Sequence, residues 1–168
     1  MLPGALLTSL TNEIFAFNTL IFAGFALSFI SMYALVFYLT RNKAASFLGG
    51  IVFSASPYHY WQATAHLSLS LIFWLPLFVL SLFYFDKHKN LKSAVFVSAV
   101  FLSIIYTTFY YGFFCAIIAV AFFGLKYIFS FKEYFKIRTF LLLIISATIV
   151  LLGFIPLWRG LQSAKATQ

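Results

Sequence analysis

Apolar residues form long runs in this chain, and short polar or basic gaps separate the runs. A run of about 20 apolar residues crosses a bilayer as a helix, because a helix rises about 1.5 Å per residue. The pattern predicts an all-α fold, a polytopic transmembrane helical bundle of about six spans. We expect one transmembrane domain over residues 1–168, with spans at residues 15–39, 44–56, 67–85, 93–106, 109–125 and 139–157.

The second span, residues 44–56, is short for a crossing, and the charges beside it favour one. If it did not cross, Arg41 and Lys43 would face the side opposite the basic segment 87–92. A crossing places both basic groups on the same side, as the usual bias of basic loops requires.

The apolar stretch at residues 93–125 is too long for one ordinary span. Thr107, Thr108 and Gly112 are residue types that favour a break. A break near residues 106–112 therefore divides the stretch into two short helices and returns the chain to the basic side.

With six spans, nine of the eleven basic residues face one side, which the positive-inside rule assigns to the cytoplasm. The segment after Pro57 then faces outward as a short interfacial helix or loop, together with the turn at 106–112 and both termini. Arg159 and Lys165 alone disagree. We expect a multi-pass protein of the plasma membrane. The nine are Arg41, Lys43, Lys87, Lys89, Lys92, Lys126, Lys132, Lys136 and Arg138.

Composition excludes a soluble domain. Hydrophobic residues make up 64% of the chain and charged residues 8%, and the mean hydropathy is +1.02. Soluble domains are about a quarter charged, so lipid must solvate most of these side chains. The net charge of +8 is explained by helix orientation, and we expect membrane lipid rather than nucleic acid as the partner.

Aromatic and hydrogen-bonding groups gather in the segments that face outward. If residues 57–66 are helical, His59 and His66 share a face, because they are seven residues apart. Tyrosines at this depth also fit an interfacial aromatic belt, whereas intramembrane histidines mark functional sites. The candidate substrate-binding residues are Tyr58, His59, Tyr60, His66, Tyr110, Tyr111 and Arg159.

The sequence lacks the motifs of several common kinds of catalytic and binding site. His59 and His66 alone do not complete a metal site, and the outward segments contain no Asp for a Ser-His-Asp arrangement. There is no phosphate-binding loop and no HExxH sequence. Cys115 lies in an apolar run and is expected to be a buried, unreactive thiol. We expect neither a metal site nor a cofactor in this chain.

Residues 44–58 read AASFLGGIVFSASPY and lead to Ala65-His66-Leu67, and the segment Phe73-Trp74-Leu75-Pro76-Leu77 follows. This order resembles large prokaryotic membrane proteins of the GT-C glycosyltransferase type. In many of them a short helix ends in a Ser-Pro-Tyr-like corner, before a Gly-His-Leu-like step and a Leu-Pro-Leu helix. Ala65 replaces the glycine here. The resemblance covers roughly residues 16–125.

The resemblance implies a membrane enzyme that transfers a sugar from a polyprenyl-phosphate carrier on the outer side of the membrane. Members usually carry an acidic motif, in an earlier outward loop, which acts as base or helps to bind a divalent metal in the full-length enzyme. This chain lacks that motif, and Glu13 does not match its position. We therefore expect either a part of a larger protein or a degenerate relative, and in both cases a chain that lacks catalysis alone. In the whole enzyme, His59, His66 and Arg159 would offset the charge of the leaving phosphate.

Two other classes fit the same pattern. A six-helix transporter, or the substrate-capture membrane subunit of an importer, also has outward aromatic loops and broken helices. Such a subunit would bind a small soluble molecule tightly. A structural subunit without ligand is the third class, and it predicts that the outward His and Tyr residues tolerate substitution.

Overall fold

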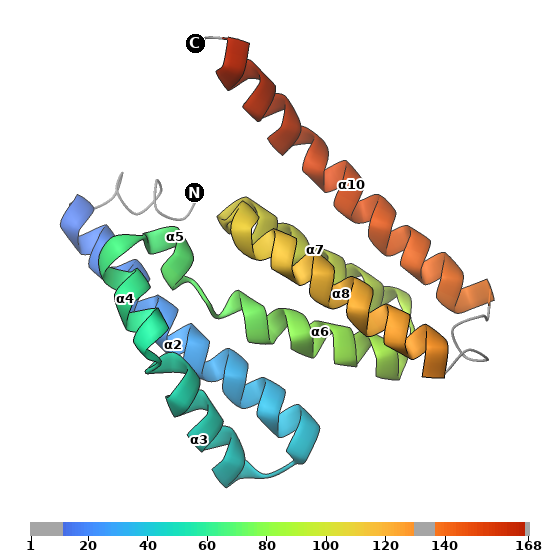
Figure 1. Ribbon diagram of the computed structural model, residues 1–168, viewed down its shortest axis with the longest axis horizontal. Coiled ribbons are helices and arrows are strands. Elements are labelled where there is room, and N and C mark those ends of the chain that lie inside the picture. Colours follow the sequence, from blue (N-terminus) through green and yellow to red (C-terminus); the bar gives the residue numbers. More distant parts are fainter. Residues whose placement is uncertain (1–11, 130–136, 167–168) are drawn as a thin grey trace. The chain divides into compact units, whose positions relative to one another are not determined.

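The computed structural model describes residues 12–129 and 137–166, and this part of the chain consists of helices joined by short connections, without strands. The predicted all-α fold is confirmed (Figure 1). The helices are α2 (Glu13–Thr40), α3 (Lys43–Ser54), α4 (Pro57–Ala65), α5 (Leu67–Ser70), α6 (Trp74–His88), α7 (Leu91–Thr107), α8 (Phe109–Phe129) and α10 (Ile137–Ala166).

Among the described residues, three helices are long and apolar enough to cross a membrane: Glu13–Thr40, Phe109–Phe129 and Ile137–Gly160. Helix α7 is apolar but shorter. Large apolar side chains are exposed along these helices; Val120 and Ile128 on α8 are 74% and 71% exposed. Soluble proteins rarely expose such continuous apolar surface. The described part of the chain therefore has three candidate membrane spans and further shorter apolar helices, as expected for a multi-pass membrane protein.

The helices divide into two compact units, residues 1–80 (unit 1) and residues 81–168 (unit 2), and the division falls within α6. Each unit has its own internal contacts. The two are described separately below.

The core of unit 1 is a hairpin of α2 and α3 (Figure 1). Arg41 ends α2 in the left-handed conformation (φ 56°), and the Asn42 side chain caps α3 by accepting from Ala44 and Ala45 N–H. Small residues line the contact, as they do where membrane helices approach closely. A Cβ added at Gly50 would lie 2.8 Å from the Phe29 ring.

The chain turns from α3 into α4 at Ser56 and Pro57. The Ser56 hydroxyl accepts from the N–H of His59, and Pro57 occupies the first turn, where its missing N–H costs nothing. The predicted helix or loop after Pro57 is a helix, which ends at Ala65.

The expected segment 67–85 is two helices, α5 and α6, with residues 71–73 between them. In one continuous helix, Pro76 would leave the Ile72 carbonyl without its usual donor, and its ring would clash with that carbonyl. Because α6 begins at Trp74, Pro76 lies in its first turn, and the Ile72 carbonyl accepts from Leu75 N–H at 3.0 Å. The segment predicted as a span at residues 67–85 is therefore interrupted at residues 71–73.

In unit 2, α7 and α8 meet at Thr108, so the break predicted within residues 106–112 is confirmed. Thr108 is extended (φ −156°, ψ 126°), and its N–H bonds the Ile104 carbonyl at 2.8 Å. Gly112 allows the two helices to approach, because a Cβ there would lie 3.0 Å from Ile105 Cγ1.

Helix α10 packs along α7 through side-chain hydroxyls. The Ser98 hydroxyl lies 3.3 Å from the Ser146 carbonyl and the Ser146 hydroxyl 3.4 Å from the Ala94 carbonyl. Further along both helices, the Tyr106 hydroxyl donates to the Gly153 carbonyl at 2.7 Å. Residue numbers rise together along the two helices, so they run parallel.

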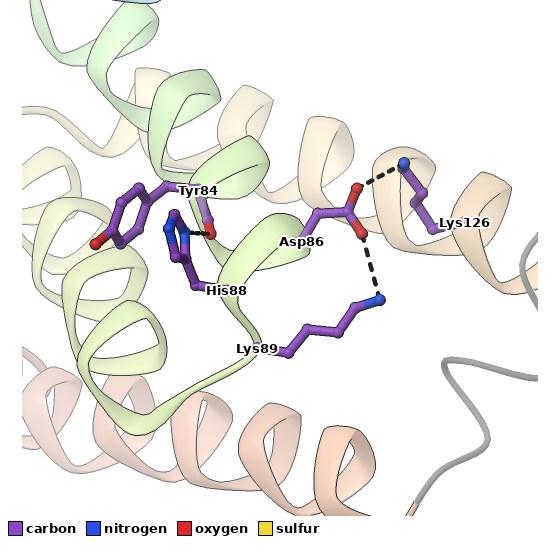
Figure 2. Close-up of polar contacts among 5 residues, drawn as sticks. All are labelled: Tyr84, Asp86, His88, Lys89 and Lys126. Carbon is purple, nitrogen blue, oxygen red and sulfur yellow. Dashed lines mark hydrogen bonds and ion pairs between the residues drawn. The ribbon is translucent and has the colours of Figure 1, made fainter. Parts of the chain in front are cut away.

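Asp86, near the end of α6, binds two lysines (Figure 2). Its Oδ2 lies 2.6 Å from Lys126 Nζ on α8, and its Oδ1 lies 3.8 Å from Lys89 Nζ. Beside them, His88 bonds the Tyr84 carbonyl through Nδ1 at 2.9 Å (Figure 2). The ion pair joins the C-terminal ends of α6 and α8.

The basic residues of unit 2 other than Arg159 and Lys165 therefore belong to one of its ends. The ends of α6 and α8 meet there, and the starts of α7 and α10 lie beside them. This agrees with the predicted grouping of the basic segments. Lys132 and Lys136 lie outside the described residues. The described members of the group are Lys87, Lys89, Lys92, Lys126 and Arg138.

Candidate functional site

His59, on the first turn of α4, is the most buried of the candidate site residues. Its side chain is 0% exposed, its ring stacks on Phe25 of α2 with centroids 3.9 Å apart, and its Nδ1 lies 2.8 Å from the Ser54 carbonyl oxygen. The cap at Ser56 fixes where α4 begins and so aims this turn at α2. The Phe25 ring and the Ser54 carbonyl therefore fix the position of the imidazole.

The surroundings favour the neutral form of this imidazole. Burial lowers the pKa of His59 below its ordinary value of 6.5, and backbone hydrogen bonds with Ser54 and Ser70 act in the opposite direction. A neutral ring that donates from Nδ1 to Ser54 leaves a lone pair on Nε2. His59 is therefore better suited to accept a hydrogen bond than to offset phosphate charge.

His66 occupies a different environment, and the expectation that it shares a face with His59 was wrong. Helix α4 ends at Ala65, and His66 is extended (φ −144°) at the junction with α5. The expectation assumed a helix through residue 66. His66 is exposed, as are Tyr58 and Tyr60, whose side chains are 46% and 70% exposed.

Two further buried polar atoms of unit 1 were not anticipated. Ser28 Oγ, one turn beyond Phe25 on α2, and Gln62 Oε1, one turn beyond His59 on α4, are buried and have no hydrogen-bond partner among the described residues. His59 Nε2 is in the same condition. A serine inside an apolar run is the signal that could have indicated Ser28, because polar groups in a membrane usually face a partner.

The remaining candidates belong to unit 2. Tyr110 is 59% exposed, whereas Tyr111 is only 4% exposed, although their rings are neighbours with centroids 6.2 Å apart. Phe109 contacts Phe154 of α10 at 5.8 Å. That contact brings the exposed Arg159, about one turn further along α10, to the same end of unit 2 as the two tyrosines.

Among the described residues, no three His, Cys, Asp or Glu side chains lie close enough together to bind a metal ion. They do not fit the divalent metal that the resemblance allows for a full-length enzyme.

The burial of His59 predicts a pH dependence of stability. Because the pKa is lower in the folded state, the stabilisation is present above the unfolded value of about 6.5 and is lost as the pH falls toward the folded value. Thermal unfolding in detergent, from about pH 8 to about pH 5, should show wild type losing more stability than His59→Phe. His88→Gln should behave as wild type. Parallel pH profiles for wild type and His59→Phe would contradict this.

No protein-family model, curated protein or solved structure matches this chain.

Proposed function

We propose that this chain is the membrane-embedded part of a GT-C-type glycosyltransferase that receives a polyprenyl-phosphate-linked sugar on the outer side of the membrane. One observation carries the proposal. The helix ends fall at the motif residues of the resemblance: α3 ends before the Ser56-Pro57 corner, α4 ends before His66, and Pro76 stands in the first turn of α6.

The proposal includes six spans with the basic end of unit 2 in the cytoplasm. The ion pair between Asp86 and Lys126 supports a common side for residues 86–92 and 126–138. On this topology α4 and the turn at Thr108 face outward, where a lipid-linked sugar would be delivered.

The exposed candidates are assigned to the ligand. Within unit 1, His66, at the α4–α5 junction, donates a hydrogen bond to the phosphate. Tyr58 and Tyr60 offer exposed rings to the sugar or the carrier chain. The acceptor is deprotonated by a carboxylate outside these residues.

Replacement of His66 should weaken binding of a lipid-linked phosphosugar. Loss of a hydrogen bond to a charged group costs about 1.5–3 kcal/mol, so His66→Ala is expected to raise Kd roughly tenfold or more. Binding of a polyprenyl-phosphate hexose to the protein in nanodiscs measures this, with the uncharged polyprenol as the reference lipid. His88→Ala is the matched control, since His88 is also exposed and lies at the basic end. Equal affinities for both variants would remove His66 from the site.

The second candidate is a substrate-capture membrane subunit, which the interrupted helices favour. The breaks at residues 71–73 and at Thr108 resemble the discontinuous helices of transporters. The same nanodisc preparation discriminates the two functions. Tight binding of a small soluble molecule, with no preference for phosphosugar lipid over polyprenol, would favour the transporter.

A further inference from the structure

The turn between α6 and α7 and the end of α8 bring four lysines to one part of unit 2. Lys126 Nζ lies 2.6 Å from Asp86 Oδ2, and Lys89 Nζ lies 3.8 Å from Oδ1 of the same carboxylate (Figure 2). Lys87 directly follows Asp86 in the chain, and Lys92 is the second residue of α7. Lys87, Lys89, Lys92 and Lys126 are called the basic cluster below.

Two helix caps fix the backbone that carries three of these lysines. Lys89, the residue after α6, is in the left-handed conformation (φ 42°), and its N–H donates to the Phe85 carbonyl at 2.8 Å. Asn90 then caps α7, because its side chain accepts from the Ser93 N–H at 2.8 Å and its own N–H donates to the Ser93 hydroxyl at 3.2 Å. A turn fixed in this way loses little conformational freedom when it binds a ligand.

One carboxylate does not balance the basic cluster. Four lysines and Asp86 together carry a net charge of +3. An ammonium group has three N–H donors, and a carboxylate oxygen occupies one of them. The Lys126 side chain is 35% exposed, so its ammonium group can donate to a second anion while it remains bound to Asp86.

Apolar side chains beside the basic cluster select the kind of anion. Leu125, next to Lys126 on α8, is exposed, as is Val95, three residues beyond Lys92 on α7. The Lys126 ammonium also lies over the Phe122 ring, 5.8 Å from its centroid. A soluble anion gains nothing from exposed apolar side chains. A phospholipid places its phosphate at the lysines and its acyl chains against the apolar residues.

We propose that the basic cluster binds the headgroup of an anionic phospholipid, whose acyl chains lie against the exposed apolar side chains beside it. Clusters of roughly four to eight basic residues at the end of a membrane helix are typical of anionic-lipid binding. The proposal requires only contacts within unit 2. It is therefore independent of the sugar-transfer function and of the side of the membrane on which this end lies.

Native mass spectrometry of the full chain in a neutral detergent tests this binding. Phosphatidylglycerol is the anionic probe, and phosphatidylcholine is the uncharged reference lipid. We expect phosphatidylglycerol to bind about tenfold more tightly, because each lysine near a membrane surface contributes roughly a fivefold preference for anionic lipid. A higher ammonium acetate concentration should reduce the preference, since salt screens exposed charges. Equal affinities for the two lipids would overturn the proposal.

Lys92→Gln and Lys43→Gln form a matched pair of variants. Both lysines are exposed and lie in the first turn of a helix that an asparagine caps, Asn90 for α7 and Asn42 for α3. Both variants keep the two lysines that bind Asp86. Lys92→Gln should lower the affinity for phosphatidylglycerol about fivefold, whereas Lys43→Gln should leave it unchanged. Equal losses would show that the lipid binds any exposed cation of the chain, and the proposal would fail.

Soluble glycerol phosphate distinguishes a lipid from free phosphate. It carries a phosphate group without acyl chains, so it lacks the apolar part of the proposed contact. We expect bound phosphatidylglycerol to remain in place when glycerol phosphate is added at the same concentration. Displacement under these conditions would mean that the basic cluster recognises phosphate alone, which contradicts a lipid site.

Discussion

His59→Ala is expected to destabilise unit 1 by about 3–5 kcal/mol, the range for truncating a large buried ring. The side chain is fully buried and stacks on Phe25. Truncation leaves a cavity between α2 and α4 and removes the donor from the Ser54 carbonyl. A buried carbonyl without its donor adds to the cost of the cavity.

His88→Ala is the matched control for this loss. His88 also packs on an aromatic ring, that of Tyr84 with centroids 4.1 Å apart, and its Nδ1 also bonds a backbone carbonyl, that of Tyr84 at 2.9 Å. The two histidines differ in burial, because His88 is exposed. Equilibrium unfolding in mixed micelles should show a loss of about 0.5 kcal/mol or less for His88→Ala. Similar losses for the two variants would mean that burial does not determine the role of His59.

The sequence predicted best those helix ends that are determined by the residue types at the end itself. The break between α7 and α8 follows from Thr108 and Gly112, and the start of α4 follows from Ser56 and Pro57. The interruption at residues 71–73 had an equally local cause in Pro76. A count of apolar residues passes over it, because proline does not lower hydropathy enough to end an apolar run.

The candidate site was less predictable, because tertiary contacts decide burial. His59 and Tyr111 are buried, yet Tyr60 and Tyr110, their neighbours within one residue, are exposed. In an amphipathic helix the polar face would indicate which side is buried, but nearly every face of these helices is apolar or aromatic. The role of His59 depends on Phe25, a residue far away in sequence that no local pattern connects to it.

Gly50→Leu is expected to separate α2 from α3 and to cost about 3 kcal/mol or more, as overpacking of a close contact does. A Cβ at this position would lie 2.8 Å from two atoms of the Phe29 ring and 3.1 Å from the Phe29 carbonyl oxygen. The ring also packs edge-on against Phe47, with centroids 5.6 Å apart. Its movement would disturb a second contact, and the carbonyl cannot move without the helix.

Gly124→Leu is the control for Gly50→Leu, because a Cβ at Gly124 meets nothing within 4 Å of the described structure. Both substitutions raise helix propensity by about the same amount, roughly 1 kcal/mol. The difference between their unfolding free energies in mixed micelles therefore measures the close contact of α2 and α3. Phe29→Ala should partly rescue Gly50→Leu, since it removes the ring but not the carbonyl, and a double variant whose two losses simply add would show that the clash is not with Phe29.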